Sequence, residues 1–449
     1  MPPPALGGAS ADERRLADIE TQLRGLREAN DDLKRQLAGV EQKLAAAPSP
    51  GLTTTVLGVQ VKLSGSITFR YAYSMNSNLT DTLTAGWTQN GLRARARLGV
   101  DFGDPAGSIV IGGFRLATGE SPNPTVGFMT VGGMFQPGSF GLDQGWLAIR
   151  PFHDRDRVSI ILGRMPNPQW RGNVGTFRSQ LVWDNDINPT GAAVKALLLD
   201  RGTQDSPVRL ENVAAYYQVQ ETLDTRFVGL TGVTSLFLDQ LKLVATKFVT
   251  GAVTFYDWEN INVGLSAPGI NSAGVSTQTA TPATLLGASL NQGNAAVSYG
   301  PTPAYGFYAN AFRIINPTVE LDLPIHSPRL GSPEVFLLGD YAHNFSTLSG
   351  AADGVGVTLG TRLGSYAAES RLNPLNVWFT YRYVDADTTI AAFADSDLGG
   401  GTHYEGFEAI AQYRVLKNLM GQVSYFDFWG YPLMENHVQT IYFDVMGDF

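Results

Sequence analysis

Cysteine is absent from the 449-residue sequence, which excludes a disulfide framework, a thiolate metal site and a cysteine nucleophile. Also missing is any run of about 18 consecutive apolar residues, so we exclude a protein that crosses a membrane with helices. The five histidines lie apart without metal-ligand spacing, and no GxSxG or comparable catalytic motif occurs. We therefore predict no catalytic residue, no metal and no cofactor, in a protein that is not an enzyme.

Charge is scarce as well, because 16% of the residues are Asp, Glu, Lys or Arg, against roughly 25% in an ordinary soluble protein. The 41 acidic and 32 basic residues give a net charge of -9, which argues against nucleic acid as a partner. The first residues, Met1-Pro2-Pro3-Pro4, lack the basic and apolar stretches of a secretory signal. Because the rest of the chain has the pattern of an exported protein, we expect that such a signal was removed.

The segment 12–47 is dense in charge and free of proline, and its apolar residues are spaced alternately three and four positions apart. This spacing predicts an α-helical coiled coil of about four heptads, a rod of roughly 50 Å. Residues 1–11 are expected to be disordered, and 48–56 form a linker rich in proline and small residues. The seam positions of the coiled coil are Leu16, Ile19, Leu23, Leu26, Asn30, Leu33, Leu37, Val40 and Leu44.

Two features of this seam favour different numbers of helices. A buried Asn at an a position, here Asn30, is best known from dimers. The hexapeptide from Arg15 to Glu20 instead resembles the Arg-hydrophobic-x-x-hydrophobic-Glu pattern of three-stranded coiled coils, in which Arg15 reaches Glu20 of the next helix. We expect a trimer; the alternatives are a dimer and a single amphipathic helix that lies on another surface.

From about residue 57 the period of the apolar residues changes from 3.5 to 2. In the segment 61–73, for example, Ile67, Phe69 and Tyr71 alternate with Thr68 and Arg70. Strands of about ten residues with this alternation, separated by turns, are typical of a transmembrane β-barrel. We predict sixteen strands, over 57–74, 90–103, 108–118, 141–151, 157–165, 191–199, 207–219, 225–237, 240–257, 303–325, 334–345, 356–366, 375–385, 403–415, 418–428 and 437–449.

The connections between these strands alternate in length. Every second connection is compact, and several of the others are long, namely 75–89, 119–140, 166–190, 258–302 and 386–402. Outer-membrane barrels have short periplasmic turns and longer outer loops. The sequence thus predicts an all-β fold, a 16-stranded antiparallel transmembrane β-barrel over 57–449, preceded by the N-terminal coiled coil.

The final strand alternates throughout and ends on an aromatic residue, Phe449. It resembles the terminal strand that the outer-membrane barrel-assembly machinery recognises. Phe449 is therefore the expected assembly signal, and that machinery is an expected partner.

Two stretches that flank the third long connection carry a wider resemblance, Leu162-Gly-Arg-Met-Pro-Asn-Pro-Gln-Trp170 and Leu181-Val-Trp-Asp-Asn-Asp-Ile-Asn-Pro-Thr-Gly191. With them, roughly 57–449 resembles bacterial porins of the sixteen-stranded "putative porin" family. The resemblance implies a homotrimer in the bacterial outer membrane, surrounded by lipid bilayer and lipopolysaccharide or by detergent, in which each barrel passes small hydrophilic solutes and ions by diffusion. A coiled coil ahead of such a barrel resembles cell-wall-tethering porins, which implies a periplasmic stalk and peptidoglycan or another cell-wall polymer as a partner.

In porins the third outer loop folds inward and narrows the channel, and the resemblance assigns this role to 166–190. Arg93, Arg95 and Arg97 share one face of a strand, with Cα atoms about 7 Å apart. On the lipid face each would cost about 2–4 kcal/mol, so they face water, where acidic loop residues would relieve their repulsion. The expected constriction residues are Trp170, Arg171, Arg178, Asp184 and Asp186. The expected pore-lining residues are Arg70, Arg93, Arg95, Arg97, Arg115, Arg164, Arg382 and Arg414.

A basic wall opposite Asp184 and Asp186 would create a transverse field, and we expect it to favour anions mildly. The alternative is that the three arginines are solvated lumen residues far from the narrowest point. Two other functions stay open. One is a structural anchor whose coiled coil links the membrane to the cell wall or to another assembly, and the other is a soluble trimeric fibre or adhesin.

Overall fold

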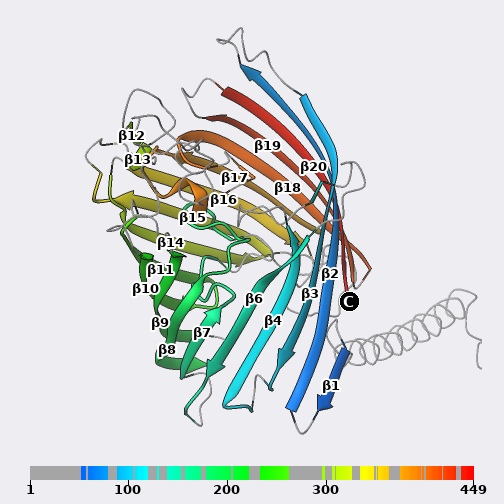
Figure 1. Cartoon of the computed structure of the whole chain (residues 1–449), viewed down its shortest axis with the longest axis vertical. Helices are drawn as coiled ribbons and strands as arrows, with labels where there is room; N and C mark the ends of the chain where they lie inside the picture. The colour runs from blue at the N-terminus through cyan, green and yellow to red at the C-terminus, as the bar shows by residue number, and fades with distance from the viewer. Residues whose placement is uncertain are drawn as a thin grey trace, which may run out of the picture. The chain divides into compact units, whose positions relative to one another are not determined.

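In the computed structural model, strands from along the chain form one antiparallel sheet that closes on itself (Figure 1). The disordered segment and coiled coil expected over 1–47 lie outside the described residues, and so do the seam positions and the Arg15–Glu20 pair. The described residues are 52–56, 59–78, 88–104, 107–119, 129–130, 139–152, 157–172, 178–203, 206–221, 233–261, 296–298, 306–308, 310–325, 334–347, 350, 352–363, 375–395, 397–398, 401–416, 418–430 and 436–449.

Sixteen strands make the ring, because each pairs with the strand before and after it and β20 pairs with β2. The predicted 16-stranded antiparallel closed barrel is therefore confirmed. Short strands β1 (Leu52–Val56) and β5 (Met129–Thr130) extend the sheet, and β12 (Ala296–Ser298) pairs with β13 (Gly306–Tyr308). The ring consists of β2 (Val59–Asn78), β3 (Thr88–Phe102), β4 (Val110–Gly119), β6 (Ser139–Ile149), β7 (Val158–Arg164), β8 (Thr190–Thr203), β9 (Ser206–Glu221), β10 (Val233–Thr246), β11 (Val249–Glu259), β14 (Arg313–Pro324), β15 (Glu334–Asn344), β16 (Asp353–Leu363), β17 (Leu375–Val384), β18 (Tyr404–Leu416), β19 (Leu419–Gly430) and β20 (Asn436–Asp448).

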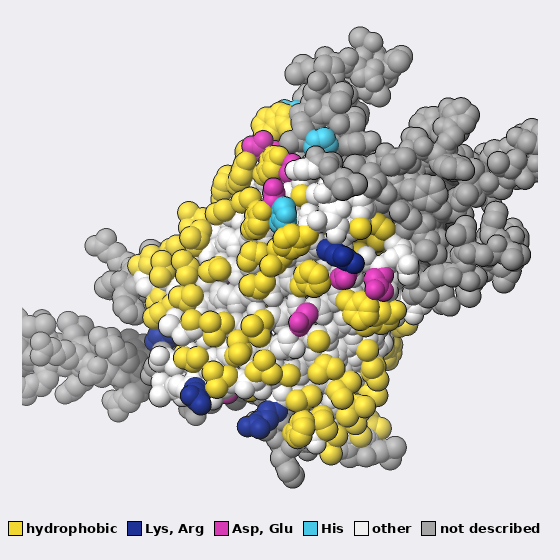
Figure 2. Space-filling view, turned by 90° about the vertical axis from the view of Figure 1, so that its left-hand side faces the viewer, with side chains coloured by type: hydrophobic (Ala, Val, Ile, Leu, Met, Phe, Trp, Pro, Cys, Tyr) yellow, Lys and Arg dark blue, Asp and Glu magenta, His cyan; other side chains and the backbone are white. Residues whose placement is uncertain are grey.

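Period-2 alternation decides which side chains face outward. Along β2, Ile67, Phe69 and Tyr71 are exposed, whereas Thr68 and Arg70 between them are buried. On the face drawn in Figure 2, hydrophobic side chains spread over most of the described surface and charged ones are few. An outer surface of this kind suits lipid, because an apolar band around a polar interior is the arrangement of transmembrane barrels.

The one strand pair that the sequence placed wrongly is β10 and β11. We expected strands over 225–237 and 240–257 with a turn at Asp239, but the hairpin turn lies at Lys247 and Phe248. The Thr246 hydroxyl accepts hydrogen bonds from the main-chain N–H groups of Phe248 and Val249, at 3.0 and 3.1 Å. Asp239 is instead a mid-strand residue that accepts a hydrogen bond from Asn212 of β9 at 2.7 Å.

The strand expected over 303–325 is shorter, because β14 begins at Arg313. Pro317 lies inside it, where a proline removes one main-chain donor. The side-chain amide of Asn316 donates to the carbonyl of Tyr341 in β15 at 2.7 Å. This side-chain bond supplies a link between β14 and β15 where the regular register is interrupted.

The seam of the barrel joins β2 to the end of the chain. Gly65 and Phe449 exchange two main-chain hydrogen bonds, both 2.9 Å long. The ring of Phe449 lies over Gly65, where a β-carbon would come within 2.2 Å of it. A larger residue at position 65 would therefore require the ring of Phe449 to move.

The inner face of β16 carries almost no side chains. Gly354, Gly356, Thr358 and Gly360 alternate with outward Val355, Val357 and Leu359. Phe336 of β15 folds over Gly360, where a β-carbon would lie 2.2 Å from its ring. This bare strip leaves room for groups that enter the barrel.

Among the described residues, none belongs to a helix long and apolar enough to cross a membrane.

Replacing Gly360 with valine should lower the free energy of unfolding by about 1–3 kcal/mol, because the added atoms overpack the Phe336 ring. Gly421→Val is the matched control, since a β-carbon at Gly421 meets no atom within 4 Å. Urea unfolding of the detergent-solubilised protein measures both variants. Equal losses of stability in the two would contradict this packing.

Candidate functional site

Two loops enter the barrel interior. The third loop (165–189) connects β7 to β8, and the seventh loop (385–403) connects β17 to β18. Leu181 and Trp183 of the third loop are almost completely buried, as are Ile390 and Leu398 of the seventh. The N–H of Asp184 donates to the carbonyl of Phe393 at 2.6 Å, so the loops contact each other directly.

An apolar cluster fixes both loops against β11. The indole of Trp183 stacks on that of Trp258, with ring centroids 6.2 Å apart. Phe393 lies 5.3 Å from Trp183 and 4.8 Å from Trp258, measured between ring centroids. Because aromatic rings bury large areas, this three-ring contact is a strong attachment of loops to wall.

A buried ionic group holds the seventh loop to the opposite part of the wall. Arg382 of β17 forms an ion pair with Asp395 of that loop, and Glu408 of β18 lies 3.6 Å from the same guanidinium. These three side chains are at most 2% exposed. Asp395 also accepts a hydrogen bond from Gln180 of the third loop at 3.1 Å, so one carboxylate ties both loops to the wall.

The arginines of β3 meet the third loop through one carboxylate. Asp186 accepts hydrogen bonds from Arg95 at 3.0 Å and from Arg97 at 2.9 Å. Burial raises the pKa of the Asp186 carboxyl, but its ion pairs with Arg95 and Arg97 outweigh this and hold the pKa below the ordinary value. Asp184, the other acid expected here, accepts the N–H of Asp186 at 2.7 Å and so shapes the loop.

Asp143 of β6 extends this network along the wall. Its carboxylate accepts a hydrogen bond from Arg115 at 2.6 Å and lies 3.9 Å from Arg97. Its main-chain carbonyl accepts one from Arg164 at 2.8 Å. Four of the expected pore-lining arginines thus contact Asp143 or Asp186, namely Arg95, Arg97, Arg115 and Arg164.

Arg70 connects the seam of the barrel to the seventh loop. Its guanidinium pairs with Asp444 of β20 at 2.8 Å and with Asp397 of the seventh loop at 3.4 Å. It also lies 4.1 Å from the centroid of the Tyr442 ring, close enough for a cation–π interaction. The closing strand pair and the inner loop therefore share one cation.

The charged side chains on the two sides of the interior differ in how much of their surface is exposed to solvent. The side chains of Arg95, Arg97, Arg115 and Asp186 keep 16–27% of their surface, whereas Arg382, Asp395 and Glu408 keep 1–2%. Water therefore reaches the β3–β4 wall, while the loops close the interior at β17 and β18.

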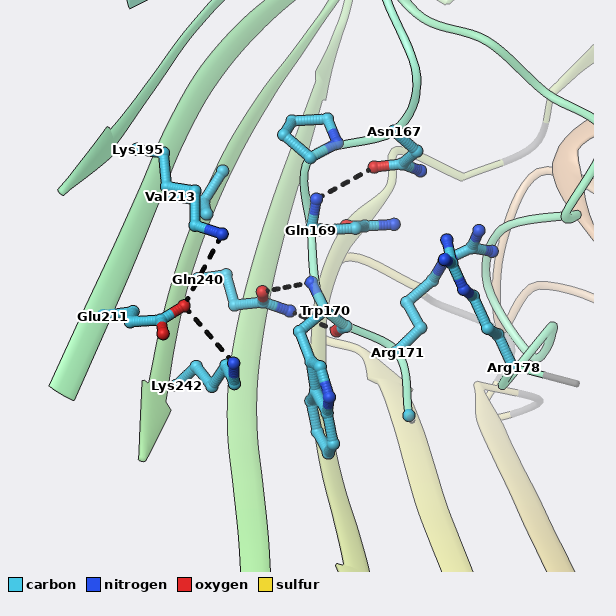
Figure 3. Close-up of a pocket in the computed structure, with 12 residues that line it drawn as sticks. Asn167, Gln169, Trp170, Arg171, Arg178, Lys195, Glu211, Val213, Gln240 and Lys242 are labelled. Carbon is cyan, nitrogen blue, oxygen red and sulfur yellow. Dashed lines mark hydrogen bonds and ion pairs between the residues drawn. The ribbon is translucent and has the colours of Figure 1, made fainter. Parts of the chain in front are cut away.

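A cavity of about 360 Å³ lies between the third loop and strands β8 to β10 (Figure 3). Gln240 of β10 holds the loop there, accepting the N–H of Trp170 at 2.7 Å and donating to its carbonyl at 2.8 Å. On the wall, Glu211 lies 3.7 Å from Lys195 and 3.3 Å from Lys242. Arg171 and Arg178 of the third loop complete the charged lining.

Arg171 is 5% exposed and donates to the main-chain carbonyls of Trp183 and Ser179. Its Nε is buried without a hydrogen-bond partner. Burial lowers the pKa of Arg171 to about 10, which still leaves the guanidinium charged at neutral pH. The loop thus carries a buried cation whose partners are neutral carbonyls.

The structure does not bring all the expected pore-lining residues together. Arg93 lies across the strand pair from Arg70. Arg414 is eight residues along β18 from Gly406, the partner of Arg382, a distance of about 26 Å along the strand. It belongs to the short-turn end of the barrel. Phe449 lies at the seam, as described above.

The seventh loop and the lysines of the cavity were absent from the expected site. A signal for the loop exists in the sequence, because the apolar run 390–394 lies between the acidic pairs Asp385, Asp387 and Asp395, Asp397. Lys195, Glu211 and Lys242 carry no comparable signal, since each is an isolated charge on the polar side of a strand. Across the described residues no group of three His, Cys, Asp or Glu could hold a metal ion.

Comparison with known proteins gives one family match. The family model described as "Putative porin" matches residues 64–216 and 231–446. No curated protein matches the chain.

Several solved structures are similar at low identity. Pseudomonas putida OprB at high pH is 10% identical, with a TM-score of 0.48 over 87% of this chain and 94% of that one. Salmonella typhi OmpF in complex with daunomycin is 10% identical, with a TM-score of 0.45 over 89% and 100%. A loop-deletion mutant of OmpT, an outer membrane protein of Vibrio cholerae, is 9% identical, with a TM-score of 0.45 over 87% and 99%.

Arg382→Met should destabilise the barrel by about 3–5 kcal/mol, because it leaves Asp395 and Glu408 buried beside no cation. The matched control is Arg313→Met, which removes an arginine 63% exposed from its pair with Asp257 and should cost about 0–1 kcal/mol. Urea unfolding gives the stabilities, and limited proteolysis within 385–403 reports release of the loop. If both variants lost the same small amount, the buried group would not be what fixes the seventh loop.

Proposed function

The chain belongs to the family described as "Putative porin", and from that premise we propose that it is a passive channel for small hydrophilic solutes and ions in the bacterial outer membrane. Porins are channels rather than enzymes. The observation that carries the proposal is the closed ring with apolar side chains outside and charged side chains inside. A sixteen-stranded ring is wide enough to hold water.

The proposed constriction lies between the paired loops and the wall of β3 and β4. The third and seventh loops close the interior at β17 and β18, so the proposed solute path passes Arg95, Arg97, Arg115 and Asp186, whose side chains are partly exposed. The cations lie on the wall and Asp186 on the loop, so the field runs across the path. Such a field orients dipolar solutes, and the excess of arginine favours anions.

The proposed assembly is a homotrimer with its coiled coil in the periplasm. The seam positions over 16–44 support a coiled coil, and the Arg15–Glu20 pair supports three helices, whereas Asn30 favours two. Bilayer lipid, lipopolysaccharide and the barrel-assembly machinery are the proposed partners of the barrel. Peptidoglycan or another cell-wall polymer is the proposed partner of the stalk.

A second function, a structural anchor, is favoured by the packing of two loops inside the barrel. An anchor needs a closed barrel and a stalk but no conducting path. Recording from the purified full chain in a planar bilayer separates the two functions. Conductance steps in groups of three support the trimeric channel, and an electrically silent insertion supports the anchor.

Changing Arg95 and Arg97 together to Gln should lower the ratio of anion to cation permeability by about twofold or more, because two cations leave the solute path. The reversal potential in a salt gradient measures this ratio. Arg414→Gln is the control, since it removes one inward cation far from the proposed constriction. Unchanged ion preference in the double variant would place the constriction elsewhere.

The ion preference should also depend on pH in a defined direction. Because the pKa of Asp186 is held below its ordinary value, this carboxylate stays ionised well into the acid range, and its contribution to the preference should be constant between about pH 7 and about pH 5. Below that, protonation removes the negative charge that Asp186 places beside Arg95 and Arg97, so anion preference should rise. In Asp186→Asn the higher preference should be present at neutral pH and should not respond to acid, and a response like the wild type's would show that another group titrates.

A further inference from the structure

We propose that the cavity between the third loop and strands β8 to β10 is a binding subsite for a small solute that carries a phosphate or carboxylate group. This inference rests on the proposed channel function, because such a solute would reach the cavity through the lumen. It is separate from the constriction, since none of the residues that line the cavity belongs to β3, β4 or β6.

The charged side chains that line the cavity are mostly cationic. Four cationic side chains, Lys195, Lys242, Arg171 and Arg178, line the cavity with a single carboxylate, Glu211. The two ammonium groups share one oxygen of that carboxylate. One acid cannot neutralise two lysines, so the wall keeps a net positive charge before the loop arginines are counted.

Among the residues described, no acidic side chain forms an ion pair with either loop arginine, although the Asp184 carboxylate is near enough to act on the charge of Arg171. Arg178 is exposed, and Arg171 is buried with its Nε unpaired. A buried charge that lacks a direct ion pair is costly, and a bound anion would offset that cost. The side chains of Arg171 and Arg178 overlap in the view of Figure 3, and the two cations are near enough for Arg178 to lower the pKa of Arg171. Two neighbouring guanidinium groups suit the several oxygens of one phosphate or carboxylate.

The cavity is also firmly built. Gln240 holds the backbone of Trp170 with two hydrogen bonds and donates a third to Thr254 at 2.7 Å. Tyr256 donates to the side chain of Gln169 at 3.1 Å. A volume of about 360 Å³ falls within the range of small-molecule sites, and the indole of Trp170 adds an apolar surface for the organic part of a solute.

Substitution of Glu211 should change the affinity for anions in the opposite direction from substitution of the lysines, and this difference tests the proposal. If the site binds anions, removing this carboxylate frees both lysines and strengthens binding, whereas removing the lysines weakens it. Simple misfolding would weaken binding in every variant. The two opposite changes therefore separate a real site from a general loss of structure.

The experiment is calorimetric titration of the purified full chain in detergent with inorganic phosphate. Relative to the wild type, Lys195→Gln/Lys242→Gln and Arg178→Gln should each weaken phosphate binding about tenfold, and Glu211→Gln should tighten it severalfold. Lys247→Gln and Arg201→Gln are the matched controls, because these residues lie in or beside the short turns and outside the cavity, and their affinity should equal the wild type's.

The same samples in a planar bilayer distinguish this inference from the proposed function. Chloride conductance without phosphate binding, or with equal affinity in all variants, would overturn the subsite and leave the channel. Phosphate binding with the expected order of variants but no conductance would overturn the channel and keep the subsite. A decrease in affinity for Glu211→Gln would also overturn the proposal.

Discussion

Hydrocarbon offers no hydrogen bonds, so every main-chain N–H and C=O of a membrane-spanning sheet needs a partner within the protein. The pairing of β20 with β2 meets this requirement by removing the free edges of the ring. Closure then divides the side chains into two sets, one facing lipid and one facing the interior. The interior becomes the place where arginines, acids and polar loops gather, and the proposed site follows from this division.

Inside the ring, two kinds of interaction hold the loops, and they act on different sides. Near β11 the attachment is apolar and aromatic, through Trp183, Trp258 and Phe393. At β17 and β18 it is ionic, through Arg382 and Asp395. Apolar contact tolerates small displacements, whereas a buried ion pair requires defined geometry. Together they hold the loops across the interior and leave the β3–β4 wall in contact with water.

Much of the barrel could be predicted from the sequence, because alternation along a strand is a local property. The strand count and the inward position of Arg70, Arg95 and Arg97 follow from it directly. Asp239 misled the prediction because a polar residue within an apolar strand looks the same as one in a turn. The closed sheet and the inner loops bring together the Arg382–Asp395 ion pair and the Lys195–Glu211–Lys242 group. No local pattern in the sequence specifies the distances between these side chains.

The strip of glycines on β16 has a consequence for how such a lumen changes its width. At Gly354 a β-carbon would lie 2.8 Å from Thr388 of the seventh loop and 3.2 Å from Leu181 of the third, so both loops rest almost on bare main chain. A methyl group added there would press on Thr388 and Leu181, so the two loops or the strand would have to shift. In the proposed channel, the space beside the loops would therefore depend on a residue of β16 that does not itself line the proposed constriction.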